Sequence, residues 1–283
     1  MTKKTYKRLN PCMLCNSYTS EIKYEKDFGI YIKCKNCGLV SVDPLPSYDE
    51  MIVRSEYWAV EHHKKEIKVN QHFSSSFQDF AYHEYLNYMK SYRIKNRVLD
   101  IGCGIGSFVY AASRNGWEAI GIDVGPAITI AKDYQLNVLK GKIEDIDFPK
   151  NYFDVITMFD VIEHVLDINS LMNEIGNCLR DNGLLIIKTP NISSLSSLIL
   201  QEKWSSVQPR DHINLFSKET LDILMRKHQF KIIKTKTIDL NLFDLKKIKN
   251  TPIQKEMKSQ EYSKRELIWK IINSKSLRLI RNL

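Results

Sequence analysis

Apolar and polar residues follow two different periods between residues 97 and 238. Short runs rich in Val, Ile and Leu predict buried strands, and longer stretches with apolar residues three and four positions apart predict helices. Strands that alternate with helices of about 10–15 residues favour right-handed crossovers and a mainly parallel sheet. The pattern predicts strands at residues 97–101, 118–123, 137–140, 152–159, 184–189 and 231–238, and helices at residues 107–115, 127–135, 168–180 and 218–228.

This alternation predicts a doubly wound α/β domain with helices on both faces of its sheet, and no strand is predicted after residue 238. Before the domain, a cysteine-bearing module ends at Pro44 and Pro46, because two prolines stop any regular element. The polar segment after it carries Phe and Tyr at helical spacing, and we expect these rings to pack on the main domain rather than to stack on bases. The predicted organisation is a cysteine module at 1–46, a helical connecting segment at 47–95, the α/β domain at 96–240 and a basic amphipathic tail at 241–283.

A glycine-rich turn separates the first predicted strand of the domain from its first helix. Glycines in this place permit a tight turn and let backbone N–H groups approach a ligand at the helix N-terminus. Ser107 stands where the dinucleotide pattern G-x-G-x-x-G needs its third glycine. Asp100, two residues before the turn, would repel a pyrophosphate but suits the positive charges of S-adenosylmethionine. The glycines of the turn are Gly102, Gly104 and Gly106.

Asp123 ends the second strand, where an acid can accept hydrogen bonds from ribose hydroxyls. Its alternative role is to cap the following helix. The turn and this acid together resemble the class I S-adenosylmethionine-dependent methyltransferases, over residues 80–240. The resemblance implies a Rossmann-like fold in which Asp100 and the glycines bind the methionine end and Asp123 binds ribose. Many relatives have an acid where this chain has Lys142, so the candidates for the adenine end are Glu144 and Asp145.

Four cysteines form two Cys-x-x-Cys pairs separated by eighteen residues. Two such knuckles can complete a tetrahedral site of four thiolates, which suits a structural Zn²⁺ because no coordination position stays open. Disulfides are less favoured in a chain without an export signal. The sequence from the second pair to Trp58 resembles the N-terminal ribbon of bacterial methyltransferases that modify sugars of surface polysaccharides and natural products, which implies a sugar-linked acceptor. The predicted metal ligands are Cys12, Cys15, Cys34 and Cys37.

Three candidate catalytic residues, Asp160, Glu163 and His164, follow the fourth strand, and ligands of doubly wound sheets lie beyond such strand ends. Methyl transfer needs an aligned nucleophile and, for a hydroxyl, removal of its proton. His164 is the candidate base because it titrates near neutrality, and its alternative role is to pack or cap the next helix. The D-x-x-E-H stretch resembles the E-x-x-E-H stretch of ubiquinone-biosynthesis O-methyltransferases, which implies a divalent cation as a further cofactor. His212, after the fifth strand, lies in a segment that resembles the part of relatives that lines the acceptor pocket, and its alternative role is structural.

Charge is concentrated near the C-terminus. Residues 245–283 contain eleven Lys or Arg against three Glu, out of a net charge of +9 for the 283 residues. Apolar residues interleaved with these cations predict either peripheral contact with an anionic membrane or an amphipathic helix packed on the protein. The sequence shows no signal peptide and no run long enough to span a membrane, so we expect a cytoplasmic protein that can also lie at the inner face of the membrane.

These observations predict an enzyme that O-methylates a sugar or another small molecule. An RNA methyltransferase with a zinc ribbon is the first alternative. The ribbon is not markedly basic and the chain lacks an interleaved aromatic and basic signature, so nucleic acid is the less favoured partner. The second alternative is a non-catalytic protein that binds S-adenosylmethionine.

Overall fold

The computed structural model describes residues 5–51, 73–237 and 278–282. The chain divides into two compact units, each assembled from separate stretches of sequence, which we name the ribbon unit and the sheet unit. The domains predicted from the sequence are continuous ranges, whereas these units are grouped by contacts in space, so the predicted boundaries stay predictions. Of the described residues, the ribbon unit comprises 5–44, 190–224, 233–237 and 278, and the sheet unit comprises 45–51, 73–189, 225–232 and 279–282.

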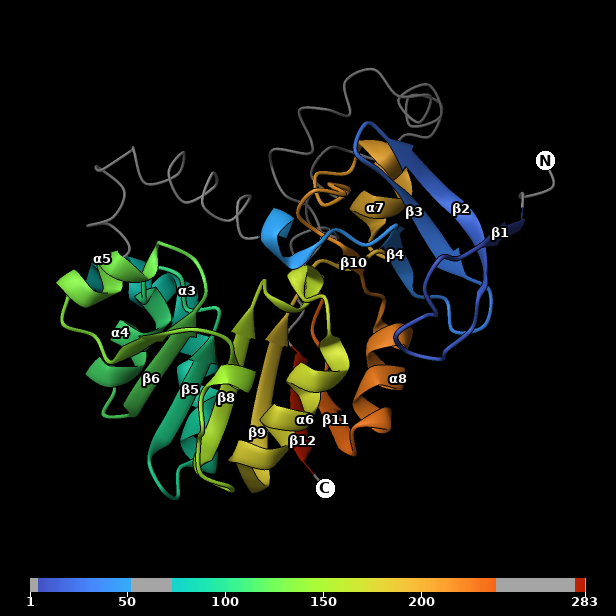
Figure 1. Cartoon of the computed structure of the whole chain (residues 1–283). Coiled ribbons are helices and arrows are strands. Elements are labelled where there is room, and N and C mark those ends of the chain that lie inside the picture. Colours follow the sequence, from blue (N-terminus) through green and yellow to red (C-terminus); the bar gives the residue numbers. More distant parts are fainter. Residues whose placement is uncertain (1–4, 52–72, 238–277, 283) are drawn as a thin grey trace, which may run out of the picture. The chain divides into compact units, whose positions relative to one another are not determined.

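One seven-stranded sheet forms the centre of the sheet unit. Its strands are β5 (Arg97–Ile101), β6 (Glu118–Asp123), β7 (Val138–Lys140), β8 (Phe153–Phe159), β9 (Leu179–Lys188), β11 (Phe230–Lys234) and β12 (Arg278–Asn282). In space they follow the order β11-β12-β9-β8-β5-β6-β7 (Figure 1). The pairings from β9 through β8, β5 and β6 to β7 are all parallel, which confirms the predicted α/β fold class. The strand order reverses between β5 and β8, and a ligand site is expected at such a switch point.

Helices follow the parallel strands along the chain. Helix α6 shows why they form: Asp167 caps its first turn by accepting from the Ser170 N–H at 3.0 Å, and its apolar residues repeat at helical spacing on one buried face. Within the described ranges, no helix has the length and apolar character that a membrane span requires. The helices are α3 (Ser75–Met89), α4 (Ser107–Arg114), α5 (Ile128–Asp133), α6 (Ile168–Cys178), α7 (Leu195–Leu200) and α8 (Lys218–Lys227), with 3₁₀ turns η2 (Lys90–Tyr92), η3 (Ile143–Asp145), η4 (Ile162–His164) and η5 (Gln201–Lys203).

Aromatic side chains attach α3 to the parallel sheet and its helices. The Tyr82 ring meets the Phe108 ring of α4 edge to face at 5.3 Å, and the Tyr85 ring meets Phe159 of β8 at 4.9 Å. Such edge-to-face pairs stabilise packing beyond the area that they bury. These contacts confirm the prediction that rings of the connecting segment pack on the main domain.

The prediction that no strand follows residue 238 is wrong, because β12 lies between β9 and β11 in the sheet. Leu279 and Ile280, which we assigned to an amphipathic tail, are strand residues. Pairing across such a long stretch of sequence leaves no local signal, since strand period alone does not identify a partner. The remaining predicted tail, residues 241–277, and with it the predicted membrane contact, lies outside the described residues.

An antiparallel sheet organises the ribbon unit. Its strands are β1 (Thr5–Lys7), β2 (Thr19–Lys26), β3 (Gly29–Cys34), β4 (Val40–Asp43) and β10 (Asn214–Leu215), which is also their order in the sheet. The first four strands come from the predicted cysteine module, and all pairings are antiparallel. The fifth strand, β10, comes from the residues between β9 and α8, so two distant parts of the chain share this sheet.

A buried ion pair anchors the amino end of the parallel sheet. Asp154, at the start of β8, is 0 % exposed, and its Oδ1 accepts from the Arg180 Nε at 2.6 Å. Its Oδ2 accepts from three consecutive backbone N–H groups, at residues 94–96, at 2.7 to 2.9 Å. Arg180 also donates from Nη2 to the carbonyl of Tyr92 at 2.8 Å. The helix predicted to reach residue 180 therefore ends at Cys178, since Arg180 belongs to the strand that holds this pair.

Asp154→Asn is expected to lower the free energy of unfolding by about 3–5 kcal/mol, because the Arg180 guanidinium then stays buried without its counter-charge. Urea unfolding measures this change. Glu118→Gln is the matched control: it removes the exposed Arg97–Glu118 pair, whose N–O distance is 3.2 Å, and should cost less than about 1 kcal/mol. An equally small effect of both substitutions would contradict the anchoring role.

Candidate functional site

The glycine-rich turn joins β5 to α4 at the carboxyl edge of the sheet. Gly102, Gly104 and Gly106 have φ angles of 70°, 53° and 80°, in the left-handed region that favours glycine. A Cβ at Gly102 would lie 2.4 Å from Val161, and one at Gly106 would lie 2.5 Å from Leu136, whereas one at Gly104 would meet no atom within 4 Å. Close packing thus requires glycine at both ends of the turn, and the middle glycine presents backbone that a ligand can approach.

Asp123 ties the turn to the end of β6. Its Oδ2 accepts from the Gly104 N–H at 2.8 Å, and its Oδ1 accepts from the Gly125 N–H at 2.6 Å. The residue that caps α5 is Ala127, so the alternative role of Asp123 as a helix cap does not apply. A carboxylate has about four acceptor positions, so these two bonds leave capacity for donors of a ligand.

Asp100 lies beside Asp123 and is 4 % exposed. The Thr157 Oγ1 donates to its Oδ1 at 2.6 Å. Burial raises the pKa of Asp100 to about 7, the charge of Asp123 raises it as well, and the bond from Thr157 opposes the rise. Burial also raises the pKa of Asp123. No Lys or Arg of the described residues forms an ion pair with either acid, so a cationic ligand would supply the missing counter-charge.

The two acids predicted for the adenine end follow β7, in the turn η3. The Asp145 carboxylate accepts from the Lys142 N–H at 3.4 Å and closes the turn. The Lys142 ammonium lies 3.5 Å from the centroid of the Tyr48 ring. Glu144, the central residue of this turn, carries an exposed side chain. Asp145 is thus engaged locally, and Glu144 is the better placed of the two to meet a ligand.

The end of β8 carries the predicted catalytic acids. Asp160 has a φ of 57° and forms an ion pair with Lys188 at the end of β9. Glu163 is 1 % exposed; its Oε2 accepts from the Thr189 Oγ1 at 2.8 Å, and its buried Oε1 has no hydrogen-bond partner among the described residues. Burial raises the pKa of Glu163 to about 7, although the neighbouring histidine opposes the rise. A carboxyl with such a pKa can exchange protons near neutrality.

The two candidate histidines belong to different compact units. His164 is half-buried in the turn η4, directly after Glu163 in the sheet unit. His212 lies in the ribbon unit, where its Nδ1 is 3.0 Å from the carbonyl oxygen of Ser206. The Tyr31 hydroxyl donates to the backbone carbonyl of His212 at 2.5 Å. His212 is thus held by contacts within its own unit.

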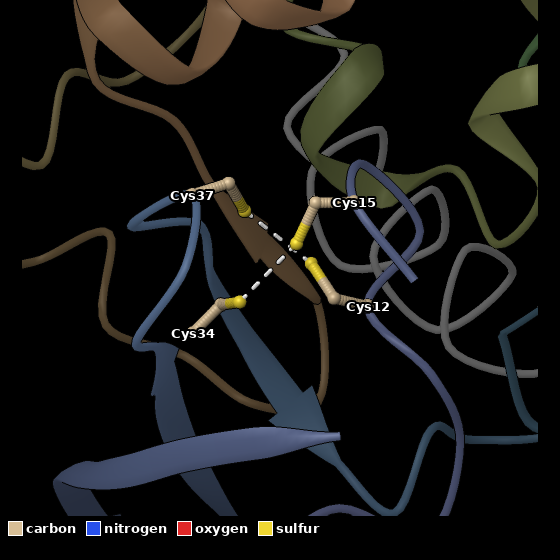
Figure 2. A group of neighbouring side chains, drawn as sticks. All are labelled: Cys12, Cys15, Cys34 and Cys37. Atoms are coloured by element: carbon tan, nitrogen blue, oxygen red, sulfur yellow. Dashed lines mark hydrogen bonds between the residues drawn. The ribbon is translucent and has the colours of Figure 1, made fainter. Parts of the chain in front are cut away.

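The structure brings the four predicted cysteine ligands together in the ribbon unit (Figure 2). Their sulfur atoms all lie within 4.8 Å of one another, with Cys12 and Cys37 at 3.5 Å and Cys15 and Cys34 at 3.5 Å. All four are free thiols, since a disulfide would need about 2.05 Å. Tetrahedral Zn²⁺ with Zn–S bonds of about 2.3 Å separates its sulfurs by about 3.8 Å, so this donor set fits the ion.

Sequence analysis missed the groups that hold these acids in place. Thr157 supports Asp100, Thr189 supports Glu163 and Lys188 pairs with Asp160. Thr157 is a central residue of β8 and faces β5 through the parallel register, in which it lies opposite Asp100. A polar residue inside an otherwise apolar strand is the signal that could have identified it, because buried hydroxyls require partners.

Comparison with known proteins identifies the family to which the chain is similar. The family described as a methyltransferase domain matches residues 42–235. The ubiquinone biosynthesis O-methyltransferase of Bradyrhizobium diazoefficiens is 35 % identical over 106 residues, which cover 34 % of this chain and 40 % of that protein. The ubiquinone biosynthesis O-methyltransferase of Pelagibacter ubique is 27 % identical over 183 residues, which cover 56 % of this chain and 74 % of that protein. The chain thus spans about two fifths of the length of the first of these relatives.

A solved structure shows the same fold. The S-adenosylmethionine-dependent methyltransferase from Archaeoglobus fulgidus superposes with a TM-score of 0.52 at 23 % identity, covering 74 % of this chain and 95 % of that one. The family match extends over more than half of the chain and contains β5, the glycine-rich turn and Asp123. The chain belongs to the methyltransferase-domain family and has the fold of the S-adenosylmethionine-dependent methyltransferase from Archaeoglobus fulgidus.

Proposed function

We propose that this enzyme transfers the methyl group of S-adenosylmethionine to a hydroxyl of a small, sugar-linked acceptor. The buried acid pair at the glycine-rich turn, Asp100 and Asp123, carries the cofactor part of the proposal. Oxygen as the methylated atom agrees with the O-methyltransferases among the relatives. The sugar-linked acceptor is supported by the resemblance of the cysteine module to the ribbon of sugar methyltransferases.

Different residues at and near the glycine-rich turn bind different parts of the cofactor. S-adenosylmethionine, when bound, supplies an electrophilic methyl group on a sulfonium. Asp100 balances the cofactor's positive charge, and Asp123 accepts from the ribose hydroxyls with the acceptor positions that Gly104 and Gly125 leave unused. Gly102 and Gly106 hold the turn in shape, and Glu144, with Asp145 beside it, serves the adenine end.

The acids and the histidine after β8 serve the acceptor. His164 takes the proton of the acceptor hydroxyl, and Glu163 beside it carries a carboxyl whose pKa burial raises to about 7. Lys188 holds Asp160 through an ion pair. Asp160, Glu163 and His164 are also the residues that would hold the divalent cation implied by the D-x-x-E-H resemblance, and His212 is a second candidate on the acceptor side.

The cysteine cluster holds one structural Zn²⁺ in this proposal. Four thiolates leave no coordination position for a substrate. The ion compensates for the small apolar core that a module of this length can build.

The affinity for S-adenosylmethionine is expected to rise from about pH 6 to about pH 8, because the cation requires the Asp100 carboxylate and burial raises the pKa of Asp100 to about 7. Below that pKa, binding must first remove a proton, so the affinity falls by up to about tenfold per pH unit. Asp100→Asn should weaken binding and flatten the profile in isothermal titration calorimetry. Asp133→Asn, an exposed acid at the end of α5, is the control that should change neither. A flat profile for the parent protein, or tighter binding of NAD, would refute the assignment.

His164→Ala is expected to abolish turnover while the affinity for S-adenosylmethionine stays within about twofold, since the proposed role belongs to the transition state. A radiolabelled methyl-transfer screen against sugar nucleotides, polysaccharide precursors and total RNA identifies the acceptor for this comparison. A strict requirement for added Mg²⁺ would assign metal-assisted deprotonation. Turnover close to that of the parent would remove His164 from the mechanism, and transfer to RNA alone would reverse the proposed acceptor class.

Protein purified without added metal is expected to contain one Zn²⁺ per chain, because four thiolates at these distances form a closed site. Cys37→Ser should lose the ion, as measured by inductively coupled plasma mass spectrometry. Cys178→Ser, at a buried thiol of α6, should retain it. Folded parent protein free of zinc would disprove the site.

A further inference from the structure

The residues that follow β9 are built on the N-terminal cysteine module. Residues 190–224 belong to the ribbon unit, whereas β9 before them and residues 225–232 after them belong to the sheet unit. A stretch that the sequence assigned to the α/β domain, His212 included, thus takes its structure from strands near the N-terminus. Contacts with strands β2, β3 and β4 hold residues of this stretch in place.

The hairpin between β2 and β3 contacts residues 202–210 of this stretch. A Cβ on Gly29 would lie 3.0 Å from the Pro209 Cβ, so the two backbones approach closely. The Arg210 guanidinium lies 2.9 Å from the centroid of the Phe28 ring. Lys26 donates to the carbonyl of Glu202 at 2.7 Å. Apolar, cation–π and hydrogen-bond contacts therefore act together at the hairpin.

Strand β4 contacts residues 213–215 of the stretch. The Val42 N–H donates to the Ile213 carbonyl at 2.9 Å, and β10 then pairs antiparallel with β4. Ile213 and the residues of β10 are all buried. The stretch thus enters the ribbon sheet as its fifth strand.

His212 lies between these two attachments and is held by Tyr31 of β3. Tyr31 is 0 % exposed, and burial raises the pKa of its hydroxyl, which therefore stays a donor to the His212 carbonyl. The His212 Nδ1 faces the Ser206 carbonyl, which can only accept, so Nδ1 carries the hydrogen and Nε2 carries the lone pair of the neutral ring. The Asp211 carboxylate lies 3.8 Å from Nε2. The contacts fix both the position and the tautomer of this histidine.

The second cysteine knuckle joins the two strands that make these contacts. Cys34 is the last residue of β3, three positions after Tyr31, and Cys37 lies three positions before β4 begins. The Cys34 carbonyl accepts from the Gly38 N–H at 3.0 Å, which closes the knuckle. An ion held by the sulfurs would fix β3 against β4, because metal binding and local folding share one free energy.

We propose that the metal-bound cysteine sheet is the frame that orients residues 205–216, with Tyr31 as the positioning residue of His212. The ribbon then orders a stretch that the sequence assigned to the α/β domain, rather than only adding stability. The inference rests on the proposed function solely for the part that His212 plays towards an acceptor. The structural part of the inference is that the order of residues 205–216 depends on the metal and on Tyr31. This part is independent of catalysis.

Hydrogen exchange of the full chain, followed by mass spectrometry, tests the frame. After zinc is removed with a chelator, peptides covering residues 205–216 are expected to exchange at least about tenfold faster, and added Zn²⁺ restores their protection. Peptides covering residues 97–123 keep their protection, and the affinity for S-adenosylmethionine stays within about twofold. Unchanged exchange at residues 205–216, in protein shown by metal analysis to be zinc-free, would overturn the proposal.

Tyr31→Phe tests the positioning role with the zinc in place. In ¹⁵N-histidine spectra, the His212 signals, assigned with His212→Gln, are expected to show the Nδ1–H tautomer in the parent and a mixture of tautomers in the variant. Tyr18→Phe removes the hydroxyl of a ring that is 49 % exposed in the same unit, and it should move neither these signals nor the exchange. Unmoved His212 signals in Tyr31→Phe would overturn the positioning role.

The two experiments separate this inference from the proposed function. If chelation unfolds the whole chain, the Tyr31→Phe variant with its zinc in place decides the question. His212 signals that move in this variant support the frame, and His212 signals that do not move overturn it. A stretch that loosens as expected in a protein that methylates no hydroxyl would contradict the proposed function alone. A stretch insensitive to both changes, in a protein that still binds S-adenosylmethionine, would contradict the frame alone.

Discussion

The structure around the glycine-rich turn, the proposed cofactor site, depends on the burial of two carboxyl groups, Asp100 and Asp123, at one edge of a parallel sheet. Neighbouring strands β5 and β6 run in the same direction, so their last residues bring both acids to the same place. Around them the described residues supply only dipoles, from Thr157 and the backbone N–H groups of Gly104 and Gly125. Dipoles offset part of the cost of burying charge, and the pKa of both acids rises in consequence. In the proposed function, the positive charge of S-adenosylmethionine supplies the counter-charge that these two buried acids lack, so the affinity for the cofactor depends on how deeply the fold buries them.

Asp154 shows the opposite solution at the other end of the same sheet. It is as buried as Asp100, but Arg180 and three backbone N–H groups satisfy its two oxygens. A fully partnered carboxylate has no reason to take up a ligand, and its contribution is to hold the loop before β5 against β8 and β9. The two acids are of one residue type and lie on adjacent strands. What separates a structural acid from a functional one here is the presence or absence of an internal counter-charge.

The parts that the sequence predicted correctly are those with local causes. Alternating periods identified the parallel strands, and short patterns correctly placed the glycine turn after β5, Asp123 at the end of β6 and the two cysteine pairs together, because such patterns involve residues close in sequence. The parts that it missed depend on pairing between distant residues. Strand β12 inserts beside β9, Thr157 meets Asp100 through strand register, and β10 joins the ribbon sheet. Hydrophobic period specifies that a strand has a buried face, but it does not specify the neighbour, so these pairings had no local signal.

The shortness of β10 explains why a metal site matters to a stretch so far from it in sequence. Strand β10 has only two residues, and their hydrogen bonds cannot offset the entropy lost when the long segment after β9 is ordered, since each ordered residue costs about 1–2 kcal/mol of backbone entropy. The stretch therefore needs partners that are already rigid before it docks. Strands β3 and β4 can be such partners only if the loop between them is fixed, and that loop is the knuckle of Cys34 and Cys37. In our proposal, zinc binding by the thiolates then orders the residues around His212, by way of Tyr31.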